Sequence, residues 1–241
     1  MMIDKKILLA LAIVCGLLLG FTAALGLAVF GENPVPVKRY KNTLQENITP
    51  AEMLPLVWER NNPERREWSV YLFSEIQKNF YILDKASDMD YFCANYNSLP
   101  EYKKVNVWGQ LFAAMTYYES GFKPNVRYVE PMSDLDPVTK QPIVSEGLLQ
   151  LGYSDNLYHG CRFDWESDSK LDPTDPKKSI FNPYKNLECG VKIMSDQIKK
   201  HGAVAINRGA YWAVIKVGHR NEKFAQIKKI VGSYTMCGNN E

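Results

Sequence analysis

The first thirty residues contain a long uncharged segment that constrains where the rest of the chain can fold. No charged side chain occurs from Ile7 to Phe30, a run of 24 residues, whereas spanning a bilayer needs about 20. Lys5 and Lys6 precede it, and basic residues are retained on the cytoplasmic side of a membrane. We therefore expect export of the remaining chain. Residues 1–30 would be either a retained signal anchor or a cleaved signal peptide, because small residues near the end of the segment would permit cleavage.

Charge and motif content argue against several classes of function. The 241 residues include 29 Lys and Arg and 27 Asp and Glu, so the basic excess that is typical of a nucleic-acid-binding protein is missing. The three histidines, His159, His201 and His219, lack the spacing of metal ligands, and the sequence has no phosphate-binding glycine loop. We expect no metal, no cofactor and no nucleic-acid partner.

Four cysteines remain after the uncharged segment: Cys93, Cys161, Cys189 and Cys237. An even number in an exported chain predicts disulfides, of which four cysteines allow three pairings. The alternatives are zinc binding and free buried thiols. Zinc requires closely spaced ligand pairs, which these cysteines do not form, and free thiols fit an oxidising compartment less well than disulfides do.

The chain divides by composition into four parts. Residues 31–48 contain prolines and several charges, which predicts a linker. Residues 49–104 predict an N-terminal helical extension, because Thr49 can cap a helix and apolar residues recur every four positions from Trp68 to Phe80. Residues 105–241 then form the main domain.

That domain is predicted to be mainly α, with a small β element. A helix over 105–120 should end at Gly121, and the polar segment 125–145 should be a loop with a short strand pair. A second helix should begin at Asn182–Pro183. Two final short helices are expected over Ala210–Val217 and Glu222–Val231.

Glu119 is an unusual carboxylate for its position. It follows Trp108, Phe112 and Met115 by spacings that place all four residues on one side of a helix. Desolvation there and the negative end of the helix dipole both raise a carboxyl pKa, as a general acid requires. The alternatives are an ion pair with a nearby cation such as Lys123 or Arg127, or a side chain that leans out at the frayed helix end.

Three short motifs follow one another along the main domain. They are Glu119-Ser120-Gly121-Phe122, then Gly147-Leu148-Leu149-Gln150, then Asn182-Pro183 with Asn186-Leu187 and Gly190. In this order they resemble the soluble lytic transglycosylase family, which shares its fold with goose-type lysozymes. The resemblance runs from about Trp108 to Lys216 and implies a lysozyme-like domain that cleaves peptidoglycan glycan strands. The sequence differs from the family at Ala210-Tyr211-Trp212, where the family has Ala-Tyr-Asn.

The resemblance also implies a mechanism. Glu119 would protonate the β-1,4 bond between N-acetylmuramic acid and N-acetylglucosamine, and the sugar's own 6-hydroxyl would close a 1,6-anhydro ring. Ser120 and Gln150 match positions that contact the sugar or stabilise the site, and Gly147 and Leu149 match the backbone that lines the cleft. Tyr211 matches the tyrosine that approaches the catalytic glutamate.

Two alternatives to this mechanism remain open. In a lysozyme-type hydrolase, a second carboxylate often orients the attacking water. Glu146 is the best candidate because it adjoins the cleft motif, and the others are Glu130, Asp134 and Asp136. The second alternative is a protein without catalytic activity, either a glycan-binding protein or a scaffold of a secretion machine.

The family arrangement implies a disulfide pairing as well. The elements that carry Cys161 and Cys189 pack side by side at the cleft in the family, whereas Cys93 and Cys237 flank the matching region. The expected pairs are therefore Cys161–Cys189 and Cys93–Cys237. The expected partners of the whole chain are peptidoglycan and, if the segment 1–30 is retained, a membrane. The protein would be periplasmic, membrane-anchored or secreted.

Overall fold

The computed structural model describes residues 53–131 and 134–238. The predicted anchor or signal segment, the linker and the helix start at Thr49 lie outside the described residues. None of the described helices is long and apolar enough to cross a membrane. The α-helices are α2 (Arg66–Leu83), α3 (Met89–Phe92), α4 (Glu101–Ser120), α5 (Asp155–Tyr158), α6 (Trp165–Asp168), α7 (Pro183–His201) and α8 (Phe224–Val231).

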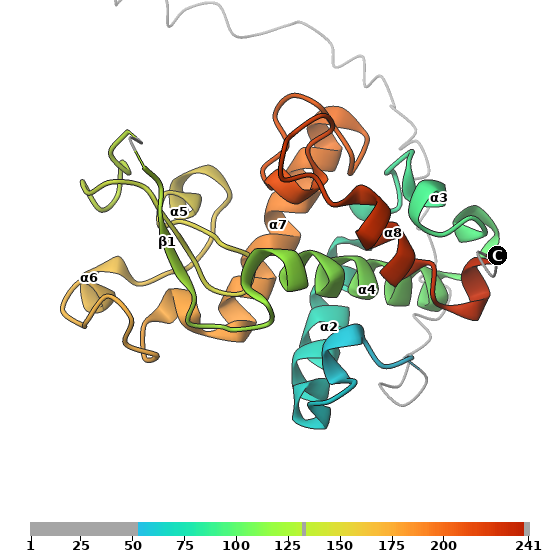
Figure 1. Ribbon diagram of the computed structural model, residues 1–241, viewed down its shortest axis with the longest axis horizontal. Helices are drawn as coiled ribbons and strands as arrows, with labels where there is room; N and C mark the ends of the chain where they lie inside the picture. The colour runs from blue at the N-terminus through green and yellow to red at the C-terminus, as the bar shows by residue number, and fades with distance from the viewer. Residues whose placement is uncertain (1–52, 132–133, 239–241) are drawn as a thin grey trace, which may run out of the picture. The chain divides into compact units, whose positions relative to one another are not determined.

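Helix α4 runs through the middle of the fold, with α2 and α8 packed against it (Figure 1). It ends at Gly121, as predicted, where the backbone turns left-handed with φ of 60°. It begins at Glu101, four residues before the predicted start, because Pro100 occupies the position before the first turn. Every residue from Val105 to Thr116 is buried, so this helix is enclosed on all sides.

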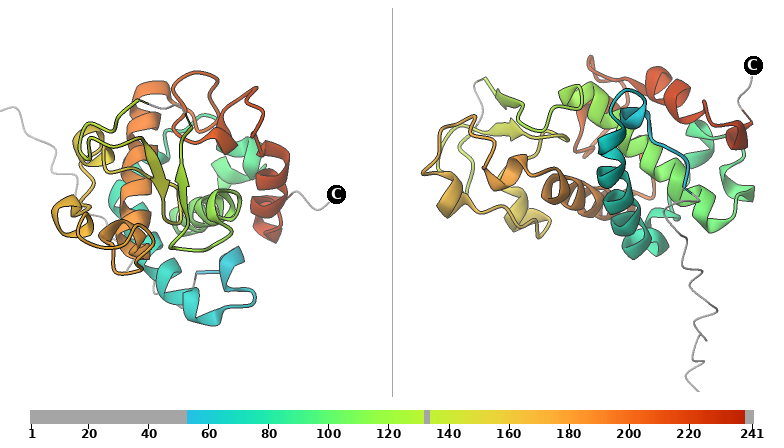
Figure 2. Two further views of the ribbon diagram at one scale, coloured as in Figure 1. Left: turned by 60° about the vertical axis from the view of Figure 1, so that its left-hand side comes forward. Right: turned by 90° about the horizontal axis from the view of Figure 1, so that it is seen from below.

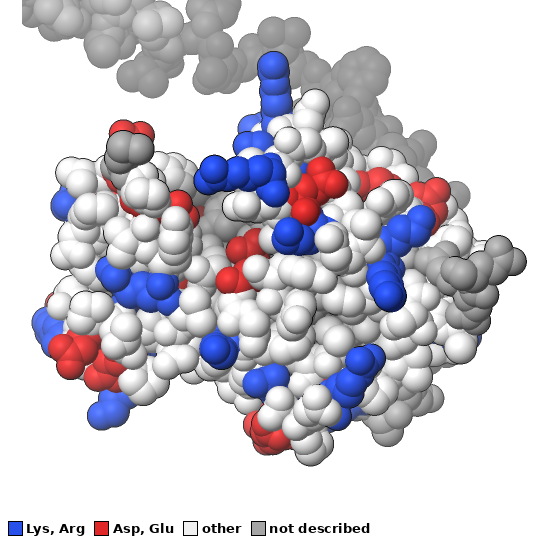
Figure 3. Space-filling view, viewed as in Figure 1, with Lys and Arg blue, Asp and Glu red and all other residues white. Residues whose placement is uncertain are grey.

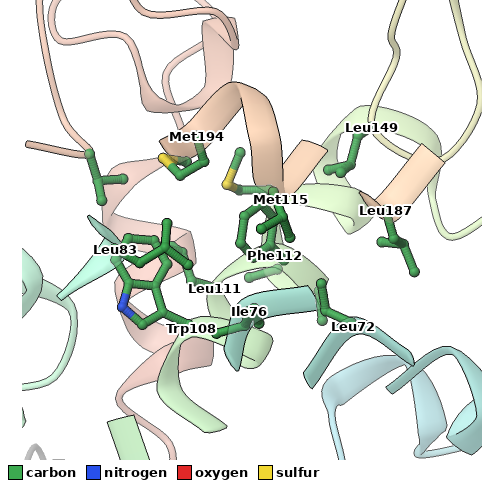
Figure 4. Packing of buried hydrophobic residues seen from close by; sticks show 14 of the residues in the cluster. Leu72, Ile76, Leu83, Trp108, Leu111, Phe112, Met115, Leu149, Leu187 and Met194 are labelled. Carbon is green, nitrogen blue, oxygen red and sulfur yellow. The ribbon is translucent and has the colours of Figure 1, made fainter. Parts of the chain in front are cut away.

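The core joins α2, α4 and α7. Figure 4 shows Met115 of α4 close to Met194 of α7, with Phe112 and Leu111 beside them. The repeat predicted for α2 is confirmed, since Leu72, Ile76, Phe80 and Leu83 are all buried. Because α2 packs directly on both α4 and α7, it belongs to the same core as the main domain.

Helix α7 begins where the sequence predicts. Asn182 caps it by accepting the backbone N–H groups of Tyr184 and Lys185, and Pro183 takes the first helical position. Its buried face includes Leu187 and Met194, and Gly202 ends it in a left-handed conformation with φ of 70°.

Within the described residues, the β element is one antiparallel pair of strands, β1 (Arg127–Val129) and β2 (Val144–Glu146), with Tyr128 opposite Ser145. Together with α5 and α6 it forms what we call the β lobe, which lies at the left in Figure 1. Figure 2 shows that the lobe sits at one end of α4 and beside α7. The predicted class, mainly α with a small β element, is confirmed.

One predicted helix is wrong. The segment Ala210–Val217 forms only a single 3-10 turn, η6 (Ala213–Ile215). Trp212 Nε1 donates to Leu149 O at 2.8 Å, and Ile206 bridges to Lys216. These long-range contacts hold the backbone extended where local propensity favours a helix. The last predicted helix does form, as α8, two residues later than expected.

Both expected disulfides are present. Cys93 joins Cys237 with a Cα–Cα distance of 4.6 Å, and Cys161 joins Cys189 at 5.1 Å. The first connects the end of α3 with the C-terminal segment, and the second connects the β lobe with α7.

Candidate active site

Glu119 lies in the last turn of α4, where this helix reaches the β lobe. Its side chain is half-buried and has no hydrogen bond or ion pair among the described residues. Arg127, one of the two cations that the sequence suggested as its partner, instead has its Nε atom 3.5 Å from Glu146 Oε1. Figure 3 shows acidic side chains in the hollow in the middle of this face, between the β lobe and the helical body.

The surroundings of Glu119 raise its pKa to about 7. Desolvation is the larger cause, and the negative charge of Glu130 is the second. Near neutral pH such a group is a proton donor.

The reason for the desolvation differs from the one that the sequence indicated. Spacing predicted an apolar stripe on one side of the helix, but α4 is buried all round from Val105 to Thr116. Glu119 lies three residues beyond the buried stretch of α4 and is half-buried, at the end of the helix that is nearer the β lobe (Figure 2).

The loop from Gly147 to Gln150 is held against α7 by Asn186. The Asn186 side chain accepts the backbone N–H of Leu149 at 2.8 Å and donates to the carbonyls of Glu146 and Ile180. Gly147 has φ of +83°, and a Cβ there would collide with Asn186 Nδ2. The motif residues therefore form one connected unit.

Two of the predicted sugar-contacting residues have structural hydrogen bonds. Gln150 Nε2 donates to Val126 O and Gly147 O, which fixes the loop next to the strand β1. The Ser120 hydroxyl is buried and donates to Thr116 O inside α4. Their contact with sugar stays a prediction.

Leu149 packs between α7 and the segment around Tyr211. Its side chain fills the space beside Gly190, where any Cβ would collide with Leu149 Cδ1. Its carbonyl accepts from Trp212 Nε1. Trp212 is buried and belongs to the hydrophobic core.

The pKa of Tyr211 is raised well above its usual value. Burial is the largest cause, followed by the charge of Asp155. The Tyr211 hydroxyl donates to Asp155 Oδ2 at 2.6 Å. The charge of Glu119, 92 positions earlier in the sequence, is a smaller cause that also raises the pKa of Tyr211.

Glu146 is the wrong choice for a water-orienting carboxylate. It is 2% exposed and accepts from Lys178 Nζ at 2.6 Å, in an ion pair buried within the β lobe. Asp136 is also structural, because it accepts the backbone N–H groups of Val138, Thr139 and Ser154. Glu130 is the carboxylate whose charge reaches Glu119.

Sequence reasoning missed Asp155 and Lys178. A local signal for Asp155 exists: its side chain accepts the N–H of Gly152 three residues earlier, as an acidic residue does in a helix-initiating turn. Its bond with Tyr211 spans 56 positions and has no sequence signal. In residues 53–131 and 134–238, no three His, Cys, Asp or Glu side chains group as a metal site would require.

Comparison with known proteins agrees with this arrangement. The family model described as the transglycosylase SLT domain matches residues 99–231, more than half of the chain. The chain belongs to this family. No curated protein is matched by the sequence.

Solved structures of a protein called DslA share the fold. Wild-type DslA form 2 has 23% identity and a TM-score of 0.62, over 76% of this chain and 98% of DslA. Two Glu→Gln variants of DslA match with 24% and 26% identity and TM-scores of 0.63 and 0.61, over 76% of this chain and 98% and 97% of DslA.

Proposed function

We propose that this protein is a muramidase, which cleaves the β-1,4 bond between N-acetylmuramic acid and N-acetylglucosamine in peptidoglycan. Glu119 donates a proton to the glycosidic oxygen, and an oxocarbenium-like state develops at the sugar carbon. The sugar's 6-hydroxyl then attacks that carbon and gives its proton to the Glu119 carboxylate. The product is a 1,6-anhydro sugar, and the acid is restored.

One observation carries this proposal: a half-buried carboxyl group at the end of the central helix of an SLT domain, with a pKa raised to about 7 and with no hydrogen bond or ion pair to any described residue. An ordinary surface glutamate with a pKa near 4.5 would hold almost no proton at neutral pH. The residues that fix the surrounding loop, Gly147 and Asn186, are themselves part of the family motifs.

Digestion of purified peptidoglycan tests the proposal. We expect Glu119→Gln to stay folded and to lose nearly all release of soluble fragments, because an amide cannot donate this proton. The matched control is Glu166→Gln, the same change at an exposed glutamate of α6. Equal digestion by Glu119→Gln and the parent would exclude Glu119 as the acid, and the glycan-binding or secretion-scaffold alternative would then be favoured.

A second candidate is hydrolysis, for which Glu130 supplies the specific observation. Its charge reaches Glu119, and its side chain accepts from Ser145 Oγ on the neighbouring strand β2. The two substituted glutamates of the DslA variants are eleven residues apart, the same separation as Glu119 and Glu130 here. In this reading the carboxylate of Glu130 orients an attacking water.

Mass spectrometry of the products separates the two candidates. An anhydro product is lighter than the hydrolysed product by one water molecule. If Glu130 orients water, Glu130→Gln should lose the hydrolysed product while Glu130→Asp keeps part of it. An anhydro product that persists at the parent rate in Glu130→Gln would assign the reaction to Glu119 alone.

The proposed place of action is outside the cytoplasm, where peptidoglycan and an oxidising environment coexist. The two disulfides support this placement. The segment 1–30 would attach the protein to the membrane or be removed during export. A reporter that is active only outside the cytoplasm, fused after residue 241, should be active. A stable but inactive fusion would contradict export.

A further inference from the structure

The β lobe contains a cavity that is separate from Glu119. The cavity has a volume of about 130 Å³, and every described residue that lines it lies from Arg127 to Lys178. Tyr153 and Lys178 are buried members of this lining, whereas Gln141 and Ser169 are exposed. The cavity therefore opens to solvent and reaches down to buried polar side chains.

The strand pair β1–β2 separates this cavity from the glutamate that acts on Glu119. Arg127 and Glu146 are opposite each other in the register, and both line the cavity. Neighbouring residues of a strand point to opposite faces, so Ser145 points away from it. The Ser145 hydroxyl donates to Glu130, whose charge raises the pKa of Glu119. The cavity and Glu130 thus lie on opposite faces of the strand pair.

Arg127 and Lys178 give the cavity hydrogen-bond donors with spare capacity. The ion pair with Glu146, at 3.5 Å from Nε, is the one polar contact of the Arg127 guanidinium within the described residues. A guanidinium has five N–H groups and can hold a carboxylate through two parallel hydrogen bonds. Lys178 Nζ donates to Glu146 and to Pro173 O, which leaves one of its three hydrogens.

The carboxylates of the cavity, in contrast, are occupied by donors of the β lobe itself. Asp168 accepts from the Tyr153 hydroxyl and from the backbone N–H and hydroxyl of Ser179. Asp136 accepts three backbone N–H groups, and Glu146 belongs to the buried ion pair described above. The groups left for a ligand are therefore mainly donors, and a ligand that accepts hydrogen bonds is favoured over a cation.

The size and the apolar part of the lining limit the ligand further. Pockets for drug-sized molecules measure about 300–1,000 Å³, so a cavity of about 130 Å³ accommodates an end group and not a glycan chain. Pro142, Val144, Trp165 and Leu171 also line the cavity. Their apolar surfaces suit a small alkyl side chain next to the hydrogen-bonding group.

We propose that this cavity binds the free C-terminal carboxylate of a short peptide. Arg127 holds the carboxylate, and the apolar residues of the lining contact the terminal side chain. The stem peptides of peptidoglycan end in such a carboxylate, so the inference deepens the proposed function by adding a peptide contact to the glycan contact. It rests on the proposed function for the source of the peptide, whereas the binding itself rests on the cavity.

The experiment is an NMR titration of the full-length protein, carrying ¹⁵N-labelled tryptophan, with N-acetyl-D-alanyl-D-alanine. The indole signal of Trp165 is identified by its absence in Trp165→Phe. We expect the free acid to shift this signal at millimolar concentrations, with a Kd at least about tenfold lower than that of its C-terminal amide, because the amide lacks the charge-assisted pair with Arg127. Tighter binding of the D form than of the L form assigns the stem peptide, and the reverse assigns a protein C-terminus.

Two variants place the binding in the cavity. Arg127→Gln should raise the Kd of the free acid at least about tenfold, while Glu146 keeps its partner Lys178. The matched control is Arg162→Gln, which removes an exposed arginine that also pairs with a glutamate but does not line the cavity. If Arg127→Gln does not fold, Ser169→Trp replaces it, because a large side chain at this exposed position blocks entry and leaves the charges unchanged.

Equal binding of the acid and the amide would overturn the inference. So would the parent affinity in folded Arg127→Gln or Ser169→Trp, or a Trp165 signal that neither peptide shifts. The titration requires no bond cleavage, so Glu119→Gln should bind the peptide as the parent does. If Glu119→Gln still digests peptidoglycan, the proposed function fails, while the titration still decides the role of the cavity.

Discussion

Replacing Gly147 with alanine tests two reasons for a glycine in the loop Gly147–Gln150. One is the positive φ of the backbone, and the other is the lack of room for a Cβ atom. Its φ of +83° is unfavourable for any residue with a Cβ. The added carbon would collide with Asn186 Nδ2 and would lie 2.8 Å from Ile180 O, a backbone atom that cannot turn away. If Asn186 moves instead, its bonds to Leu149 and Glu146 are lost.

The magnitude follows from these three costs. Left-handed strain contributes about 1 kcal/mol, overpacking about 1–3 kcal/mol and each lost hydrogen bond about 1 kcal/mol. We expect Gly147→Ala to reduce the free energy of unfolding by about 3–5 kcal/mol. Urea denaturation followed by tryptophan fluorescence measures this as a lower midpoint at an unchanged slope.

Gly121→Ala is the matched control. Gly121 is also left-handed, with φ of +60°, but no other atom lies within 4 Å of its added Cβ. It should therefore cost only the backbone strain, about 1 kcal/mol. If Gly147→Ala costs no more than Gly121→Ala, then the close approach of Asn186 does not constrain this loop and the reasoning is refuted.

Three further changes have expected effects on stability. Above pH 7, Glu119→Gln should be more stable than the parent by roughly 1–3 kcal/mol. The reason is that the pKa of Glu119 is raised in the folded state, so the parent loses stability as the pH rises from about 4.5 through about 7. Chemical denaturation of both proteins at pH 5 and pH 8 checks this, and a stability difference that is the same at the two pH values would contradict it. Lys178→Met should reduce the free energy of unfolding by about 3 kcal/mol, because the buried Glu146 loses the Lys178 Nζ atom that lies 2.6 Å from its carboxylate. The double variant Lys178→Met/Glu146→Gln should recover part of this loss. Removing the Cys93–Cys237 bond, which has a sequence separation of 144, should reduce stability by about 5 kcal/mol, whereas removing Cys161–Cys189, with a separation of 28, should reduce it by about 3–4 kcal/mol. Thermal unfolding of the two double-serine variants measures both losses. A larger loss for Cys161–Cys189 would refute the loop-entropy argument.

Local signals predicted those parts of the fold that are set by neighbouring residues. Gly121 ends α4 because only a left-handed residue closes that turn, and Asn182 with Pro183 begins α7 through its side-chain cap. The position of Glu119 was evident from its placement among apolar residues at a helix end. The disulfide pairing followed from the family resemblance and is present in the structure.

Long-range contacts account for what the sequence could not predict. Trp212 is held by a carbonyl 63 positions away, which prevents the helix that its segment favours. Glu146 adjoins the cleft motif in sequence, yet its side chain points to Lys178, 32 positions later. Asp155 reaches Tyr211 across 56 positions. Partners at such separations leave no periodic pattern, so only the folded chain identifies them.

The dependence of kcat/KM on pH, measured for the parent protein on purified peptidoglycan, tests most directly whether Glu119 acts as a neutral acid. The pKa of about 7 predicts activity that is constant on the acidic side and falls roughly tenfold for each pH unit above about 7. A rate that stays level or rises between pH 7 and pH 9, with the protein still folded, would contradict the account.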